Sequence, residues 1–387
     1  MTNAALGEVE PVSCAFVLSV GGTQVLYGTN RFDSDLLVPF QKSDVVCGDD
    51  DFFGPRSSTS VVARRLDILG FTLPAAETAY ARGLRTYKEK FPGYPWPPNL
   101  AAWQRGVSSQ AARIEALGPY QPVDDQLFVW EETLLGFPGG SLWIVVRALV
   151  DALGPDDSVS LDLTELAAGG YLEEGADLWD EFERTPVVVL TEGKSDARLL
   201  RLALDTLLPD YADFIRFLDY DFARAAGGVG EVVRFVKMFA GSGIQNRIVA
   251  LFDNDTAGRQ ALGDLGPLPG NVFPMCLPSV DRFKNYPALG PDGPGMSDVD
   301  GRACSLELYL GREALTDTTG NLRPVRWTAF NEKLGRYQGE IPGKGDVQAK
   351  FEEILRVIAA SPEQRSKYDL AGVEMVFGAM FDALASR

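Results

Sequence analysis

Three acidic residues in the middle of the chain have the types and spacing to bind a divalent cation. Glu192 follows the apolar run 186–190, and Asp253 and Asp255 follow a second run, 247–252. If the second run stays extended, both aspartates point to the same side, because side chains alternate along a strand. Converging carboxylates repel one another unless a cation neutralises them, and oxygen ligands suit Mg²⁺ or Mn²⁺.

The elements around these residues predict where the carboxylates meet. Both runs are continuous and rich in β-branched residues, which is typical of strands buried on both faces of a parallel sheet. Strands and helices alternate as β-α-β-α-β-α-β, with strands expected at 186–190, 214–218, 247–252 and 272–276. Ligands of such sheets bind outside the carboxyl ends of the strands, and the acidic residues lie at two of those ends.

The two acidic motifs together resemble a Toprim domain, the catalytic module of topoisomerases, bacterial primases and OLD-type nucleases. The resemblance is carried by Val-Val-Leu-Thr-Glu-Gly at 188–193 and Phe-Asp-Asn-Asp-Thr-Ala-Gly at 252–258. It implies that Glu192 is a metal ligand or an acid–base group, and that Asp253 and Asp255 bind metal. Each motif alone is equally compatible with a turn or a helix cap.

The resemblance also implies further site residues. Asp196 stands where the family often has an acid. Glu307 lies in the segment 301–310, which we expect to begin a helix, and resembles a later acidic metal ligand of OLD-type nucleases. For both residues an ordinary capping or surface role stays open. Lys194, Arg259 and Lys284 are candidate phosphate contacts, although each also fits a solvent-facing charge.

The flanking segments resemble HEPN/Toprim-associated proteins of bacteria. Residues 13–27 alternate around Gly21-Gly22, which predicts a β-hairpin, and residues 326–340 carry the second part of the resemblance. The expected fold class is α/β: a Toprim-type small parallel sheet flanked by helices, with an α+β N-terminal domain and a helical C-terminal extension. The expected domains are 1–180, 185–315 and 316–387.

Composition narrows the chemistry. The 387 residues include no histidine, which excludes Ser-His-Asp triads, His-based zinc sites and the HEPN ribonuclease motif itself. The net charge of −18 argues against a protein that coats nucleic acid through basic residues alone. The four cysteines form no C-x-x-C pair. A signal peptide or long apolar span is absent, so we expect a cytoplasmic location.

The leading interpretation is a Mg²⁺-dependent nuclease that uses Mg²⁺ or Mn²⁺ to hydrolyse DNA or RNA phosphodiesters. The resemblance implies an anti-phage defence or toxin-like effector, controlled by a protein regulator or by homo-oligomeric assembly, with no membrane partner. Two alternatives remain. One is the Toprim module of a topoisomerase-like or primase-like enzyme, although we find no nucleophilic tyrosine domain or zinc motif. The other is a catalytically degenerate regulatory binding protein.

Overall fold

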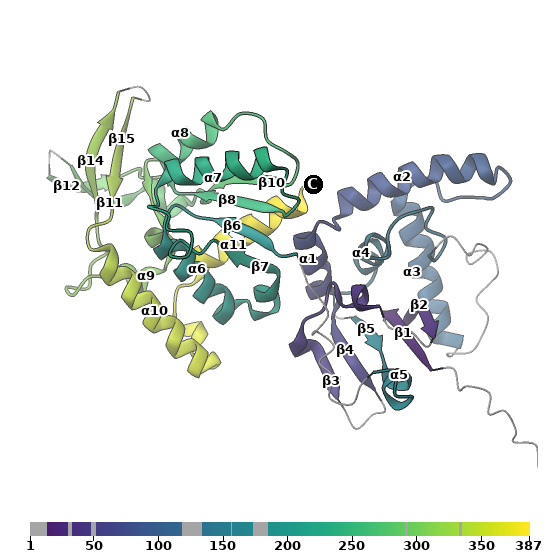
Figure 1. Cartoon of the computed structure of the whole chain (residues 1–387). Helices are drawn as coiled ribbons and strands as arrows, with labels where there is room; N and C mark the ends of the chain where they lie inside the picture. The colour runs from purple at the N-terminus through teal and green to yellow at the C-terminus, as the bar shows by residue number, and fades with distance from the viewer. Residues whose placement is uncertain are drawn as a thin grey trace, which may run out of the picture. The chain divides into compact units, whose positions relative to one another are not determined.

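The computed structural model describes residues 14–29, 33–47, 52–117, 134–155, 157–172, 185–290, 293–332 and 335–387 (Figure 1). The chain divides into two compact units. The first comprises residues 1–67 and 71–184, and the second comprises residues 68–70 and 185–387. No helix within the described ranges is long and apolar enough to cross a membrane.

The first unit contains an antiparallel sheet with strand order β2-β1-β5-β4-β3. Its strands are β1 (Ala15–Val20), β2 (Thr23–Thr29), β3 (Val45–Cys47), β4 (Phe53–Ser58) and β5 (Ser158–Asp162). The predicted hairpin is confirmed, because β1 pairs with β2 across Gly21 and Gly22. Both glycines have positive φ, 53° and 75°, a backbone conformation that glycine adopts without steric cost.

Helices complete the first unit. They are α1 (Thr59–Leu69), α2 (Leu73–Lys90), α3 (Leu100–Leu117), α4 (Leu142–Ala152) and α5 (Thr164–Ala168). Aromatic side chains from α2, α3 and a following loop form the centre of its core: the rings of Tyr80 and Trp103 both meet Phe137 edge-on, with centroids 5.2 and 5.1 Å away. The predicted α+β character of the N-terminal region is therefore confirmed.

The second unit is built on a four-stranded parallel sheet with order β10-β8-β6-β7. Its strands are β6 (Val187–Leu190), β7 (Ile215–Phe217), β8 (Ile248–Phe252) and β10 (Val272–Cys276). The connecting helices are α6 (Lys194–Leu207), α7 (Val229–Ser242) and α8 (Thr256–Asp264). The predicted order of strands and helices is confirmed, and Figure 1 shows the helices on both faces of this sheet.

Alternating residues of the central strands enter two different cores, which explains why the strands are apolar throughout. Val249 and Leu251 pack in one cluster with α6, and Ile248, Ala250 and Phe252 pack in another with α7. A strand covered on both faces has no solvent side and therefore needs no polar alternation. This burial fixes the carboxyl ends of β6 and β8, where the acidic residues follow.

The C-terminal region differs in part from the prediction. Helices α10 (Lys344–Ala360) and α11 (Ala371–Ala385) are present, as expected, together with the short α9 (Arg312–Leu315). A second small sheet of order β12-β11-β14-β15 accompanies them, formed by β11 (Tyr286–Gly290), β12 (Gly293–Ser297), β14 (Val325–Asn331) and β15 (Arg336–Glu340).

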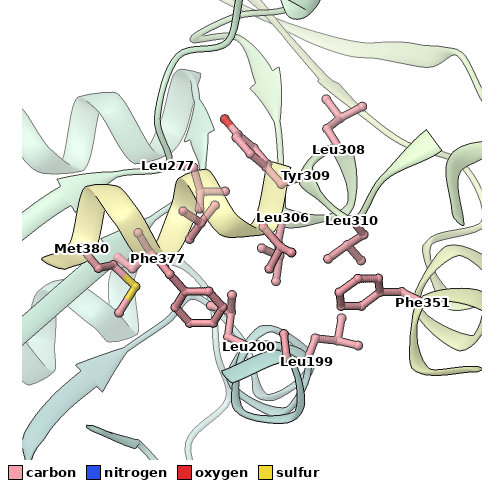
Figure 2. Packing of buried hydrophobic residues seen from close by; sticks show 14 of the residues in the cluster. Leu199, Leu200, Leu277, Leu306, Leu308, Tyr309, Leu310, Phe351, Phe377 and Met380 are labelled. Atoms are coloured by element: carbon pink, nitrogen blue, oxygen red, sulfur yellow. The ribbon is translucent and has the colours of Figure 1, made fainter. Parts of the chain in front are cut away.

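The two long C-terminal helices belong to the core that carries the parallel sheet. Figure 2 shows Leu199 and Leu200 of α6 pointing toward Phe351 of α10 and Phe377 of α11. All four side chains are at most 1% exposed. This packing holds the start of α10 beside the start of α6, the turn that contains Asp196.

The segment 301–310 corrects one prediction. In place of the start of an α-helix, it forms the short strand β13 (Ala303–Cys304) and a 3₁₀ turn at Leu306–Tyr309. Strand β13 pairs with β9 (Asn254–Asp255), the extension that follows Asp253. The pairing keeps the backbone extended through Cys304 and holds this segment against the end of β8.

Candidate functional site

The carboxyl ends of β6 and β8 are joined by one hydrogen bond between the predicted site residues. The backbone N–H of Asp253 donates to Oε1 of Glu192 at 2.9 Å. The Glu192 backbone is fixed in turn, because its carbonyl accepts the N–H of Gly228 at the start of α7, at 2.5 Å. Burial of the adjacent strands in parallel register therefore brings together two residues that are distant in sequence.

Asp255 lies beside the other carboxylates and also caps a helix. Its Oδ1 accepts the N–H of Gly258 at 2.7 Å, so Asp255 is the N-cap of α8. The intervening Asn254 is fully buried and has different partners: it donates to Asp300 and accepts from Arg259. The helix-cap reading of this motif is thus correct for Asp255, and it leaves the roles of Glu192 and Asp253 unexplained.

Asp196 and Glu307 approach the same place from α6 and from the 3₁₀ turn after β13. Ser195 lies within 3.4 Å of Oδ1 of Asp196, and the Glu307 charge repels Asp196. Glu307 is 2% exposed and accepts hydrogen bonds from Ser305 at 2.5 Å and from Gln348 at 2.8 Å. All five predicted carboxylates are therefore electrostatically coupled neighbours.

Lys344, the first residue of α10, brings a positive charge into this cluster. Its Nζ lies 3.3 Å from Oε2 of Glu307. Burial opposes the charge of Lys344, but Glu307 and Asp253 together raise its pKa above the usual range, so it stays an ammonium. Although burial also opposes ionisation of Glu307, Lys344, Ser305 and Gln348 hold the pKa of this carboxyl below its usual range.

The other carboxyls are shifted in the opposite direction. Burial, followed by repulsion from Asp255 and Asp196, raises the pKa of Glu192 to about 7, against the effect of the Asp253 N–H. Burial and the Glu307 charge raise the pKa of Asp196 to about 6. Burial and the Glu192 charge raise the pKa of Asp253 well above its usual range. One lysine does not offset the repulsion among these groups.

A small cavity opens between the carboxylates. Its volume is about 10 Å³, close to that of one water-sized sphere, and Glu192, Asp196 and Asp253 are among the residues that line it. The donors are all oxygens, which is the chemistry that Mg²⁺ and Mn²⁺ prefer. Within the described ranges, however, no three acidic or cysteine side chains are close enough to hold a metal ion without rearrangement.

Comparison with known proteins identifies part of the first unit. Residues 15–94 match the HEPN/Toprim N-terminal domain 1 family. The match confirms the N-terminal part of the resemblance to HEPN/Toprim-associated proteins, and it spans β1 to the residues just after α2. No curated protein and no solved structure matches the chain. The carboxylate cluster lies outside this HEPN/Toprim N-terminal domain, so its interpretation rests on its own geometry.

The three predicted phosphate contacts lie in different surroundings, all outside the HEPN/Toprim N-terminal domain. Lys194 is exposed at the start of α6 and pairs with Asp221 at 3.3 Å. Arg259 donates to buried Asn254 and so supports the loop after β8. Lys284 pairs with Asp281 three residues earlier, and both are largely exposed. Lys194 alone lines a large cavity beside the site.

Two residues of the cluster were missed in the sequence. Lys344 lies in Pro-Gly-Lys-Gly-Asp at 342–346, which lacks the spacing and the Ser/Thr of a phosphate-binding P-loop. Ser305 lies two residues before Glu307 and binds its carboxylate. No local pattern marks Lys344, because its place beside Glu307 arises from the packing of α10 against α6.

Proposed function

We propose that this chain is a metal-dependent nuclease whose second unit is a Toprim domain. The observation that carries the proposal is the convergence of Glu192, Asp196 and Asp253 on one small cavity at the carboxyl edge of the parallel sheet. These three carboxylates are partly buried, and their raised pKa values mean that the site opposes their ionisation. Titratable groups with such shifts cluster at functional sites.

The residues present suit phosphodiester hydrolysis. Glu192, Asp253 and Asp255 would hold Mg²⁺ or Mn²⁺, with Asp196 and Glu307 as further ligands. When bound, the ion activates water and neutralises charge on phosphoryl oxygens. Lys344 offers a positive charge to a bound phosphate in the same place.

The central test is cleavage by Asp253→Asn protein in Mg²⁺ and in Mn²⁺. Substrates are supercoiled DNA, linear DNA, single strands and tRNA. Asp264→Asn is the matched control: it makes the same change of charge at a residue that is exposed at the end of α8. We expect the control to cleave like the wild type and Asp253→Asn to lose at least about 100-fold, about 2.7 kcal/mol in the barrier. Undiminished cleavage by Asp253→Asn would sink the assignment.

A second candidate is a regulatory binding protein with a degenerate site. It is favoured by one observation: no three potential ligands in the described ranges are placed to hold a metal ion as they stand. Thermal unfolding in a Mg²⁺ or Mn²⁺ titration separates the two candidates. Stabilisation of the wild type that is absent in Asp253→Asn supports the nuclease, and absence of stabilisation in both supports the degenerate site.

The biological role of the proposed nuclease is that of a defence or toxin-like effector. This part rests on the HEPN/Toprim N-terminal domain, whose name associates the chain with HEPN and Toprim systems. Induced expression in a bacterial host should arrest growth or reduce phage yield, and the Asp253→Asn protein at equal abundance should not. If both proteins arrest growth or reduce phage yield equally, the effect does not depend on the carboxylate site.

A further inference from the structure

A basic groove lies next to the carboxylate cluster within the second unit. It is a cavity of about 640 Å³, lined mainly by α6, by β7 and by the loop that follows β7. We define the groove by its four cationic side chains: Lys194, Arg198 and Arg201 of α6, and Arg216 of β7. The volume lies within the range of small-ligand sites in proteins, about 300–1,000 Å³.

The charge of the groove contrasts with that of the chain. Two carboxylates, Asp219 and Asp221, also line the groove, and Arg198 and Arg201 are paired with Glu352 and Asp205 at 2.5 and 2.9 Å. In the described part of the chain, Lys194 and Arg216 are the cations of the groove without such a partly buried partner, and the whole chain has a net charge of −18. Lys194, Arg198 and Arg201 follow a spacing of four and three residues, which places them on one face of α6. The sequence therefore concentrates positive charge on the one helix that also contributes Asp196.

The cations of the groove are available to an anion to different degrees. Lys194 pairs with Asp221 at 3.3 Å, but both side chains are more than 70% exposed, and such pairs contribute little. Arg216 is exposed and has no ion-pair partner among the described residues. Arg201 is held by Asp205 and by backbone carbonyls, which gives it a structural role. Lys194 and Arg216 are thus the residues to test.

The groove adjoins the carboxylate cluster. Gln348 lines the groove and also donates to Oε1 of Glu307 at 2.8 Å. Ser195, another lining residue, lies beside Asp196. The first turn of α6 separates the two, and its N-cap, Gly193, provides no side-chain hydrogen bond. The N–H groups and dipole of that turn favour an anion on this side.

We propose that the groove binds the phosphates of a nucleic acid strand whose neighbouring phosphodiester reaches the carboxylate cluster. This inference rests on the proposed nuclease function and names the surface that delivers its substrate. Cations in a groove follow a strand backbone, and aromatic rings beside it stack on bases. Phe222, next to the lining residue Asp221, is 89% exposed and offers such a ring.

The test measures binding without cleavage. A fluorescein-labelled 12-nucleotide single strand, as DNA and as RNA, is titrated in EDTA and followed by anisotropy at several salt concentrations. The variant is Lys194→Gln with Arg216→Gln. The control is Arg234→Gln with Lys237→Gln, which removes the same charge from exposed positions of α7. We expect the variant to bind about tenfold more weakly at low salt, with a salt slope shallower by about 1.4, since each phosphate contact to a single strand contributes about 0.7.

The outcomes separate the groove from the proposed nuclease function. The inference is overturned if the wild type binds neither strand, or if variant and control share one affinity and one salt slope. It is also overturned if dTMP displaces the strand as effectively as an unlabelled 12-mer, because the site would then accept a free nucleotide. Groove-dependent binding without any cleavage removes the nuclease proposal alone. Cleavage with unaltered binding by the variant removes the groove alone.

Discussion

Neutralising Glu192 should stabilise the metal-free protein at alkaline pH while removing its response to Mg²⁺. In Glu192→Gln the shape of the side chain is kept, and the amide oxygen can still accept the N–H of Asp253. The substitution removes a negative charge that burial and two neighbouring aspartates disfavour. A residue kept for stability would behave in the opposite way, since its removal would weaken the fold.

The size of the effect follows from the pKa. A carboxyl pKa raised from 4.5 to about 7 corresponds to a cost of about 3 kcal/mol for the ionised group at pH 8, at about 1.4 kcal/mol per pH unit. A carboxyl whose pKa is raised by folding favours the folded state below its unfolded pKa and loses that contribution as the pH rises through the folded one. The wild type should therefore lose this stability between about pH 4.5 and pH 7, and Glu192→Gln should not.

Circular dichroism melting at pH 5 and pH 8 in EDTA gives the comparison. The two proteins should melt alike at pH 5, and Glu192→Gln should melt higher at pH 8 by about 6–12 °C, at about 2–4 °C per kcal/mol for a unit of this size. Mg²⁺ at about 100 times its Kd should increase the free energy of unfolding of the wild type at pH 8 by about 2.7 kcal/mol and so raise its melting temperature. It should leave the variant unchanged.

Exposed Glu340 of β15 supplies the matched control, because Glu340→Gln makes the same chemical change away from the cluster. It should alter the free energy of unfolding by less than about 0.5 kcal/mol at either pH. If Glu192→Gln is less stable than the wild type at pH 8 in EDTA, burial and repulsion do not dominate at Glu192, and the reasoning fails.

The remaining predictions concern Lys344, the glycines of α8 and the core. Lys344→Met should abolish cleavage and lower stability at pH 8 in EDTA, because it leaves a buried carboxylate unpaired; retained cleavage would exclude a role for its charge. In Gly258→Ala the new Cβ would meet the carbonyl oxygen of Asp253 at 2.2 Å, so Mg²⁺ binding should weaken. Gly263→Ala, whose new Cβ would meet open space, should leave Mg²⁺ binding unchanged and stabilise the fold by up to about 1 kcal/mol. If both glycine variants weaken Mg²⁺ binding equally, the proposed difference between the two positions is wrong. Phe377→Ala should cost about 3–5 kcal/mol in chemical denaturation, and a smaller loss would mean that this core collapses around the cavity.

The parts of the fold that were predicted from sequence are those in which one local pattern decides the structure. Strands β6 and β8 are short apolar runs because both of their faces are covered, and that burial is visible residue by residue. Their carboxyl ends then place Glu192 and Asp253 together, since parallel strands end at one edge of a sheet. The hairpin of β1 and β2 was equally local, because Gly21 and Gly22 determine its turn.

The parts that were not predicted depend on contacts between distant segments. A lysine after Pro-Gly has no local feature that distinguishes it from a surface residue, and Lys344 meets Glu307 only because Phe351 of α10 packs against α6. The pairing of β13 with β9 likewise decides the conformation around 303–304, where sequence alone favoured a helix. In both cases tertiary contacts override the local preference.

The acids of the cluster that have no structural role are the strongest evidence for the proposed cation. Asp255 caps α8, and Glu307 has an ion pair with Lys344, so stability alone could retain both. Glu192, Asp196 and Asp253 have no ion pair among the described residues, and burial disfavours the charge of each. An amide at any of these three positions would keep the shape and avoid the repulsion. A chain that keeps three acids there accepts a loss of stability at alkaline pH, which the proposed cation would offset when bound.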